Sequence, residues 1–551
     1  MDDKVTPPQM VEATGSDQSD SSPDEKHTPP SLIQVPNNVD VNAPRGRFAF
    51  GAQGKSLLRM ITGCGAIGFM LFGYDQGVLG GINTSNDFLA QFGYPSSSLL
   101  GTINAIYEIG CFAGAINVFL VGEKIGRRKC LYVGALLMGI GAILQASAFG
   151  VPQMIVGRVV CGWGNGFNTA TTPIWVSELS PAKSRGRMVA AEGSLIAFGI
   201  VIASYYNIGM YYAKGPVVWR APIASQLIFI IAQVAMVVVL PESPRWLARH
   251  GRHQEAVDIL AQLKGHDTPL DDPAVLTKKA EIDQILQLEH ADGPWHIKEC
   301  FRSGPLKIRR RYLLAIGVQV MQQLSGINLL VYYFPHILTV DLGRSHEFAL
   351  QLAAGLAVTY WVFSFIPWMW LDKISRRQPL VIGAFVCSFC FLIAAILQSE
   401  EGSNTRIQAS LAFFFLFEAV FAIGWLPVPW LYPAEIMPLR HRTHSAALAT
   451  AADWIFNYMI VQVTPIMISN IRWKSYMVFF VLNFAHGVVV FLFFPETSGK
   501  SLEEMDSMFM GNNDRILVVD KKGSLLPGFR GRYDGSDDFS IATTTGVNLI
   551  A

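Results

Sequence analysis

Charged side chains are scarce in this chain of 551 residues, and their scarcity excludes an ordinary soluble protein. Asp, Glu, Lys and Arg make up 15% of the residues and hydrophobic residues make up 51%, whereas soluble domains carry about 25% charged residues. The net charge of +1 gives no argument for nucleic-acid binding. Apolar runs long enough to cross a bilayer recur along most of the chain. We therefore predict an all-α, polytopic membrane protein.

The sequence also lacks the motifs of several enzyme and cofactor-binding classes. It has no Walker A sequence, so we expect no ATP-driven activity. The C-x-x-C formed by Cys387 and Cys390 has no histidine nearby, which indicates helix packing rather than a zinc or redox site. The glycine-rich stretch 162–166 follows no strand and indicates close packing of helices rather than a dinucleotide loop. We expect no enzyme activity, no metal and no cofactor.

Twelve apolar segments divide the chain into two halves. A Ser- and Pro-rich tail, 1–57, is predicted to be disordered. A six-span half (58–240), a helical loop (241–311), a second six-span half (312–494) and a polar tail (495–551) follow. The spans are predicted at 58–82, 99–121, 130–150, 152–174, 188–210, 217–240, 312–338, 347–371, 379–398, 407–432, 444–469 and 474–494.

The Lys and Arg residues are distributed unevenly between the loops on the two sides of these spans. The loops of one side carry 24 of them and the alternate loops carry 5. By the positive-inside rule, the first side is cytoplasmic, and it includes both termini and the loop 241–311. Two apolar stripes in that loop predict amphipathic helices lying against the inner face of the bundle. The stripes are Ala256, Val257, Leu260 and Leu263, and Ile282, Ile285 and Leu286.

Three pairs of short motifs show that the two halves repeat. Glu123-Lys-Ile-Gly-Arg-Arg128 matches Asp372-Lys-Ile-Ser-Arg-Arg377, and the segments ending at Glu178 and Glu435 also resemble each other. Pro-Glu-Ser and Pro-Glu-Thr, which begin at 241 and 495, close the two halves. Offsets of 249, 257 and 254 residues indicate a duplication. Duplicated halves are typical of transporters that hold their substrate between the halves near the middle of the membrane.

The stretch Gln319–Tyr333 is unusually polar for its position inside the apolar run 312–338. Amides are unfavourable in hydrocarbon unless a ligand or a neighbouring helix pairs them. They converge only if the helix breaks near Gly326, which is tolerated where the freed backbone lines a cavity. We predict a polar, uncharged binding site here; the alternative is that the amides hold helices together. The amides are Gln319, Gln322 and Gln323 on one helical face and Asn328 roughly opposite.

Six specific motifs occur along residues 58–505. They are Gly126-Arg127-Arg128, Gly157-Arg158, Pro173-x-Trp-x-Ser-Glu178 with Arg185-Gly186, Pro241-Glu-Ser-Pro-Arg245-Trp-Leu, Gln319-x-x-Gln-Gln-x-Ser-Gly-Ile-Asn328 and Pro495-Glu-Thr. With these motifs, this part of the chain resembles the sugar porter family of the major facilitator superfamily. The Glu108 region and Glu192–Gly199 are similar to fungal members, including the glycerol/proton symporter branch. The resemblance implies the major facilitator fold, with twelve transmembrane helices in two pseudo-symmetric halves.

Asp75 in the first span and Arg158 in the fourth span are the candidate pair for proton coupling. A carboxylate inside the membrane is costly and suggests a function. When protonated it releases the arginine, and when ionised it pairs again. The resemblance implies that an aspartate at position 75 carries the proton, whereas facilitative relatives often have a neutral residue there. A static ion pair is the alternative.

The resemblance assigns substrate binding to the amides and to nearby aromatic residues. Amides suit vicinal hydroxyls, and an indole face suits the apolar face of a sugar or polyol. Pro427 and Pro429 predict an unwound segment beside the candidate indole, that of Trp430. Two departures affect the substrate: Ala197 replaces a glutamine common in hexose transporters, and Asp453 adds a charge. The predicted ligands are Gln319, Gln322, Gln323, Asn328, Tyr332 at the rim of the site, Trp430 and Asn457.

Charged residues at the cytoplasmic ends of the helices form a third predicted group. The resemblance implies salt bridges between the halves that lock the outward-facing state and break as the halves rock. The alternative is that these charges only set the topology. The group comprises Glu178, Arg185, Glu435, Arg127, Arg128, Arg376 and Arg377. No role is predicted for Glu108, Glu192 or Glu418, which also lie within spans.

These observations together predict proton-coupled uptake of a mono- or disaccharide across the plasma membrane, driven by the proton gradient. The substrate is a small sugar or polyol, and the other partners are protons and the lipid bilayer. Four alternatives stay open. They are a glycerol or polyol symporter, a facilitator, a nutrient sensor and a location in the vacuolar membrane.

Overall fold

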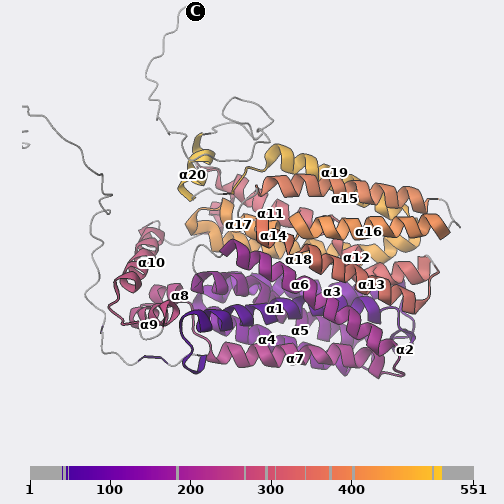
Figure 1. Cartoon of the computed structure of the whole chain (residues 1–551), viewed down its shortest axis with the longest axis horizontal. Helices are drawn as coiled ribbons and strands as arrows, with labels where there is room; N and C mark the ends of the chain where they lie inside the picture. Colours follow the sequence, from indigo (N-terminus) through magenta and orange to yellow (C-terminus); the bar gives the residue numbers. More distant parts are fainter. Residues whose placement is uncertain are drawn as a thin grey trace, which may run out of the picture.

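The computed structural model of the chain describes most of the predicted membrane region. The described residues are 40, 45–46, 49–180, 185–265, 268–291, 296–304, 306–341, 343–370, 375–399, 404–498 and 502–511. Most of the tail 1–57 and all of residues 512–551 lie outside this description. So do the side chains of residues 185–190, 288–291, 340–341, 370, 404, 439, 502–504, 507 and 511. Figure 1 shows the described part as one elongated helical bundle with a small helical group at one end.

The bundle consists of two groups of long helices that pack side by side (Figure 1). Each group contributes six spans, as the sequence predicts. The first comprises α1 (Gly54–Ile82), α3 (Ser97–Ile125), α4 (Arg127–Ala146), α5 (Val151–Leu179), α6 (Arg185–Tyr211) and α7 (Val217–Val239), with the short α2 (Asn86–Gln91) after α1. The second comprises α11 (Ile308–Leu324), α12 (Ile327–His336), η4 (Ile337–Asp341), α13 (His346–Phe363), α14 (Ile366–Trp370), α15 (Arg377–Gln398), α16 (Asn404–Gly424), α17 (Val428–Ile436), α18 (Leu439–Ile471) and α19 (Lys474–Phe493).

Eleven helical segments in the described part of the chain are long and apolar enough to cross a membrane. The one predicted span not among these eleven is 152–174. It corresponds to α5, which is 29 residues long but less apolar than the others. Its polar residues include Arg158, Asn165 and Asn168, and all three are buried. α5 packs against α1, α3 and α4, so its polar face is turned into the protein and not toward lipid.

Three spans of the second half are broken into two helices. α11 and α12 are separated at Ser325 and Gly326, α13 and α14 at Ser364 and Phe365, and α16 and α17 at residues 425–427. Breaks within a membrane leave backbone groups without helical partners, so they occur where protein or a cavity satisfies those groups. The sequence predicted the first and third breaks but not the second.

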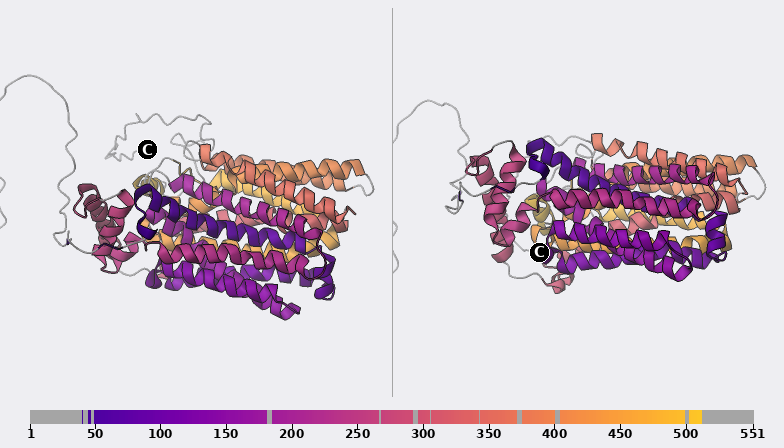
Figure 2. Two further views of the ribbon diagram at one scale, coloured as in Figure 1. Left: turned by 60° about the horizontal axis from the view of Figure 1, so that its bottom comes forward. Right: turned by 90° about the horizontal axis from the view of Figure 1, so that it is seen from below.

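The loop between the halves folds into helices at one end of the bundle, here named the loop face. These are α8 (Pro244–Arg249), α9 (His253–Lys264) and α10 (Pro273–Ala291), and α20 (Leu502–Gly511) lies at the same end (Figures 1 and 2). Ala256, Ile259 and Leu286 join a buried apolar cluster with Leu57 of α1 and Trp175 of α5. Part of the predicted stripes, namely Ala256, Leu263, Ile282 and Leu286, therefore packs against the ends of the membrane helices, whereas Val257 and Leu260 pack within the loop against Leu270 and Val275.

The repeat seen in the sequence has a structural basis at the loop face. Glu242 of Pro-Glu-Ser accepts hydrogen bonds from the backbone N–H groups of Arg127 and Arg128, at 3.1 Å each, where α4 begins. Glu496 of Pro-Glu-Thr accepts the same kind of bond where α15 begins, with Arg377 at 3.1 Å. Both glutamates cap a helix N-terminus, where a negative charge is favourable. Burial nevertheless raises the pKa of Glu242, and these backbone amides oppose that shift.

Candidate functional site

The break between α11 and α12 depends on one glycine. Gly326 has φ +97° and ψ +9°, a left-handed conformation that side chains with a Cβ rarely adopt. The backbone freed by the break is satisfied locally, because Asn483 of α19 donates to the carbonyl of Ser325 at 2.8 Å and Ser325 Oγ donates to the carbonyl of Gln322 at 2.6 Å. The predicted break near Gly326 is therefore confirmed.

Replacement of Gly326 by Ala tests this break. The left-handed conformation costs about 1–2 kcal/mol for a residue with a Cβ. The new methyl group would also lie 2.9 Å from ring atoms of Phe391 and Phe479, and overpacking costs about 1–3 kcal/mol. We expect a loss of about 2–5 kcal/mol, measured as a lower thermal unfolding midpoint of the detergent-solubilised protein. Gly209→Ala is the control, since no atom lies within 4 Å of its ideal Cβ. Equal midpoints for the two variants would contradict the prediction.

The break between α16 and α17 is coupled to the amide stretch. Pro429 has no N–H group, so the carbonyl of Trp425 four residues earlier loses its helical donor. Gln322 replaces that donor, because its Nε2 donates to this carbonyl at 2.6 Å. Trp430, the predicted indole ligand, lies half-buried in the first turn of α17. An amide of α11 thus holds open the break that positions Trp430.

A second amide network joins α11 and α12 to α18. Gln323 Nε2 donates to Asp453 Oδ1 at 2.6 Å, and Asn328 Nδ2 donates to Gln323 Oε1 at 2.5 Å. All three side chains are buried. The carboxylate of Asp453, noted in the sequence as a departure from the family pattern, therefore fixes the orientation of Gln323.

Several polar atoms of the predicted ligands have no hydrogen-bond partner. Among the described residues, Gln319 Oε1, Gln322 Oε1 and both polar atoms of the Asn457 side chain are buried without a hydrogen-bond partner. Buried polar groups are nearly always paired, so these atoms have unused hydrogen-bonding capacity. Helix pairing, the alternative interpretation, therefore holds for part of the amide stretch, and substrate binding stays a prediction. The NH₂ groups of Gln322 and Gln323 tie helices together, whereas the unsatisfied atoms are available to a hydroxylated substrate.

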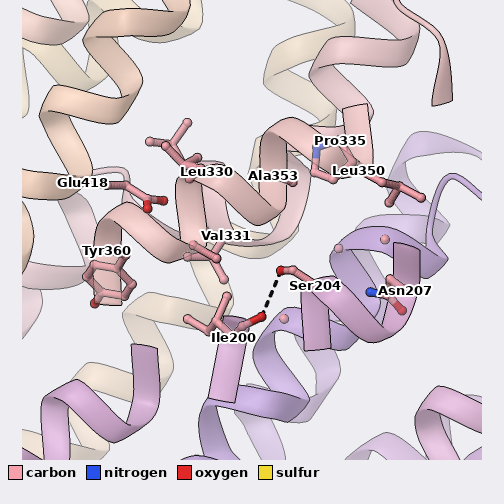
Figure 3. Close-up of a pocket in the computed structure, with 15 residues that line it drawn as sticks. Ile200, Ser204, Asn207, Leu330, Val331, Pro335, Leu350, Ala353, Tyr360 and Glu418 are labelled. Carbon is pink, nitrogen blue, oxygen red and sulfur yellow. Dashed lines mark hydrogen bonds between the residues drawn. The ribbon is translucent and has the colours of Figure 1, made fainter. Parts of the chain in front are cut away.

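A small cavity of about 30 Å³ lies between the halves (Figure 3). Residues of α1 and α6 line it from the first half, and residues of α12, α13 and α16 line it from the second. None of the predicted substrate ligands is among the described residues that line it. Glu418 of α16 extends into it beside Tyr360, and its Oε2 has no partner within the described part of the chain. The sequence predicted no role for Glu418.

The predicted coupling pair is formed and completely buried. Arg158 Nη1 donates to Asp75 Oδ2 at 3.0 Å, and both side chains are 0% exposed. Arg158 Nη2 donates to the backbone carbonyl of Asn104 on α3 at 2.9 Å, and the guanidinium lies 4.4 Å from the centre of the Tyr107 ring. The arginine therefore bridges α1 and α3 from its position on α5.

Two hydrogen bonds that the sequence did not predict connect α3 of the first half to α12 of the second. Tyr332 donates to Glu108 Oε1 at 2.9 Å, and Asn104 Nδ2 donates to the hydroxyl of Tyr333 at 3.2 Å. Tyr332, which the sequence predicted at the rim of the site, is completely buried. The signal in the sequence was the pair Asn104 and Glu108, one helical turn apart in an apolar span.

The arginines and glutamates of the third predicted group form ion pairs at the loop face, but within each half. Arg127 pairs with Glu123 at 2.7 Å and with Glu178 at 3.2 Å, all in the first half. Arg376 pairs with Glu435 at 3.1 Å in the second half. Arg128 and Arg377 donate to backbone carbonyls of Val237 and Phe491. The sequence predicted pairs between the halves; these pairs differ because each glutamate lies beside the arginine of its own repeat. The side chain of Arg185 is outside the described part.

Residues 61–509 match the family described as sugar (and other) transporter. This chain belongs to the sugar transporter family. The transporter is 41% identical over 479 residues to the MFS-type transporter oryC of Aspergillus oryzae, covering 86% of this chain and 89% of that protein. It is 34% identical over 475 residues to the sugar transporter STL1 of Saccharomyces cerevisiae, covering 84% and 82%. It is also 32% identical to the high-affinity glucose transporter 1 of Candida albicans, covering 82% and 85%.

The transporter also matches solved structures of a major facilitator. The proton:xylose symporter XylE bound to 6-bromo-6-deoxy-D-glucose superposes with a TM-score of 0.70 and 25% identity, over 83% of this chain and 100% of that chain. A partially occluded inward-open form of XylE from E. coli gives a TM-score of 0.69. The predicted major facilitator fold is confirmed, and the protein is a transporter and not an enzyme.

Proposed function

We propose that this transporter brings a sugar into the cell together with a proton, across the plasma membrane and by alternating access. The main evidence for proton coupling is the ion pair of Asp75 and Arg158. An ion pair that is 0% exposed at membrane depth is costly to maintain. Protonation of Asp75 changes the net charge of the first half, close to the contact between the halves. The structural match to a proton:xylose symporter supports the same function.

The proposed orientation of the protein in the membrane rests on the charges of its loops. The loop face carries the Lys- and Arg-rich segments, so we assign it to the cytoplasm, together with both termini. Asp75 then lies about 10 Å from the external end of α1, at 1.5 Å rise per residue. A proton reaching it from outside neutralises the carboxylate and releases Arg158. The gradient of protons supplies the energy, and no cofactor takes part.

In this proposal, the side-chain amides of α11 and α18 form the substrate-binding site. The unsatisfied oxygens of Gln319 and Gln322 accept hydrogen bonds from sugar hydroxyls, and the Asn457 amide both accepts and donates. The half-buried indole of Trp430 offers a flat apolar face. We propose that ion pairs such as Arg127–Glu178 and Arg376–Glu435 hold the loop-face end of each half rigid, so that the halves rock as units.

A polyol is the second candidate substrate. Ala197 offers no hydrogen bond from α6, and the carboxylate of Asp453 already occupies the donor of Gln323. With fewer free amide groups, the site suits a smaller hydroxylated molecule as well as a hexose. The same experiment distinguishes these substrates.

The test measures external pH in a dilute, unbuffered suspension of hexose-transporter-deficient yeast that expresses the chain. Glucose, xylose, sucrose and glycerol are added in turn. We expect alkalinisation after one of them, because each substrate molecule removes a proton from the medium, and a protonophore should abolish it. Entry of labelled substrate without a pH change would leave a facilitator and refute symport. Entry of none of the four would refute the proposed substrate class and favour a sensor.

A further inference from the structure

Two buried carboxylates lie near one buried arginine in the first half: Asp75 pairs with Arg158, and Glu108 lies within its electrostatic reach. Asp75, Glu108 and Arg158 are each 0% exposed. Asp75 accepts a hydrogen bond from Nη1 of Arg158, and Nη2 of the same arginine donates to the carbonyl of Asn104. Glu108 follows Asn104 by one turn on α3, so the arginine faces the turn of α3 that carries Glu108. Glu108 Oε2 is buried and has no hydrogen-bond partner among the described residues.

Charge balance limits how many protons this group can hold. Arg158 keeps its charge and neutralises one carboxylate. A second ionised carboxylate in the same dry region is costly, so it holds a proton instead. When Asp75 is ionised and paired, Glu108 is therefore the protonated member. When Asp75 is protonated, Glu108 is the carboxylate that can balance Arg158.

We propose that Glu108 is a second proton-carrying residue of the transport cycle, and that Asp75 and Glu108 share one proton across Arg158. This inference rests on the proposed symport. It assigns a role to a residue for which the sequence predicted none. Asp75 and Glu108 act on one arginine, so they titrate as a coupled pair and not as independent groups.

The cycle that follows conserves every proton. A proton from the external side forms an O–H bond on Asp75 and releases Arg158. Arg158 then pairs with Glu108, whose O–H bond breaks, and that proton leaves toward the loop face. On return, the proton of Asp75 passes to Glu108, and Arg158 pairs again with Asp75. One proton has crossed the membrane, and no other reactant is consumed.

The depths of the residues agree with this direction. Asp75 and Arg158 each lie about 10 Å from the end of their helix at the face opposite the loop face. Glu108 lies about 16 Å from the corresponding end of α3. A proton that enters at Asp75 and leaves from Glu108 therefore moves toward the loop face.

Tyr332 connects the proton on Glu108 to the substrate site. Its hydroxyl donates to Glu108 across the contact between the halves at 2.9 Å, and it follows Asn328 by one turn on α12. A hydrogen bond to an ionised carboxylate is roughly twice as strong as one to a neutral acceptor. Loss of the proton from Glu108 thus strengthens the hold of α3 on the helix that carries a predicted substrate ligand.

The remaining titratable groups near Glu108 do not replace Arg158. Tyr333 faces it from α12, Asp453 from α18, and Tyr107 and Cys111 lie on its own helix. None of these four is a cation. The arginine is therefore the group whose partner decides whether Glu108 is ionised.

Four variants of the full-length chain in the same yeast strain test the proposal. Glu108→Gln and Tyr332→Phe change the proposed link. Glu347→Gln and Tyr212→Phe are matched controls, because Tyr212 donates to Glu347 at 2.9 Å in an exposed pair that also joins the two halves. The probe is whichever of labelled glucose, xylose, sucrose and glycerol the unaltered chain accumulates. Accumulation, its dependence on external pH, and counterflow of labelled against unlabelled probe are measured.

We expect Glu108→Gln to retain counterflow but to lose accumulation and its pH dependence, since Gln cannot exchange a proton. We expect Tyr332→Phe to reduce accumulation about tenfold, the effect of about 1.4 kcal/mol, and to add no further loss to Glu108→Gln. Neither control should change accumulation by more than about twofold, as for exposed pairs.

The outcomes separate this proposal from the proposed symport. If Glu108→Gln still accumulates the probe with the original pH dependence, Glu108 carries no coupled proton and the inference is wrong. If that variant loses counterflow, Glu108→Asp decides the matter: restored, pH-dependent accumulation supports the inference, and continued loss of counterflow assigns Glu108 a structural role and overturns it. If the unaltered chain shows no proton uptake with any probe, the proposed symport itself fails.

Discussion

Replacement of Asp75 by Asn will abolish accumulation of the substrate and leave its exchange across the membrane intact. Asn resembles the protonated carboxyl group in size and in hydrogen bonding but cannot lose a proton. The variant should therefore bring the substrate to equal concentrations on the two sides and no further. Uptake by the unaltered chain should rise as external pH falls, because protonation of Asp75 precedes inward movement, whereas uptake by the variant should not respond to pH.

The expected size of this effect follows from the driving force. A pH difference of one unit supplies about 1.4 kcal/mol per proton, which supports about a tenfold accumulation ratio at one proton per substrate. A membrane potential of about 100 mV adds about 2.3 kcal/mol. Loss of the whole ratio is thus a large signal. It is measured as the internal concentration of labelled probe at the end of uptake, with and without a protonophore.

The structure predicts that this variant still folds. Removing one member of a buried ion pair typically costs about 3–5 kcal/mol, because the other charge is left unpaired. Arg158, however, keeps its hydrogen bond to the carbonyl of Asn104 and its position over the Tyr107 ring. Retained counterflow is the internal control for folding. Concentrative, pH-dependent uptake by Asp75→Asn would refute the role of Asp75 and leave a static ion pair.

The sequence could predict this pair because both residues are improbable where they stand. A charged residue in an apolar span needs a partner, and few partners are available inside a membrane. The break at Gly326 was predictable for the same reason: four amides in one span must either pair or converge. The repeat offsets predicted the two halves, and the equivalent caps at Glu242 and Glu496 explain why those glutamates recur.

Contacts between the halves could not be predicted, because they depend on how two separately patterned helices face each other. Glu108 and Tyr332 are 224 residues apart, and nothing in either span specifies the other. The loop-face ion pairs were predicted between the halves from the family resemblance, yet the ones described here join residues of one half. Charge alone does not decide among several nearby partners, since Arg127 can reach both Glu123 and Glu178.

Replacement of Asn457 by Leu should weaken substrate binding strongly without weakening the fold. Asn457 is 1% exposed, and within the described part of the chain neither polar atom of its side chain has a hydrogen-bond partner. Asn457 makes no internal hydrogen bond that the change to Leu would remove. Leu also has nearly the same size, so it opens no large cavity. If a sugar hydroxyl is the missing partner, its loss costs about 1–3 kcal/mol, which raises the KM about tenfold to a hundredfold.

A second variant separates binding from folding. Gln323→Leu also removes a predicted ligand, but it breaks the hydrogen bonds to Asp453 and Asn328 and leaves a buried carboxylate without its donor. We expect this variant to lower the thermal unfolding midpoint of the purified protein as well as its affinity. Asn457→Leu should keep that midpoint or raise it, because a buried polar group without a partner destabilises the empty protein. A lowered midpoint with an unchanged KM for Asn457→Leu would show that this amide serves the packing of α18. The substrate site would then have to be placed on the free oxygens of Gln319 and Gln322 alone.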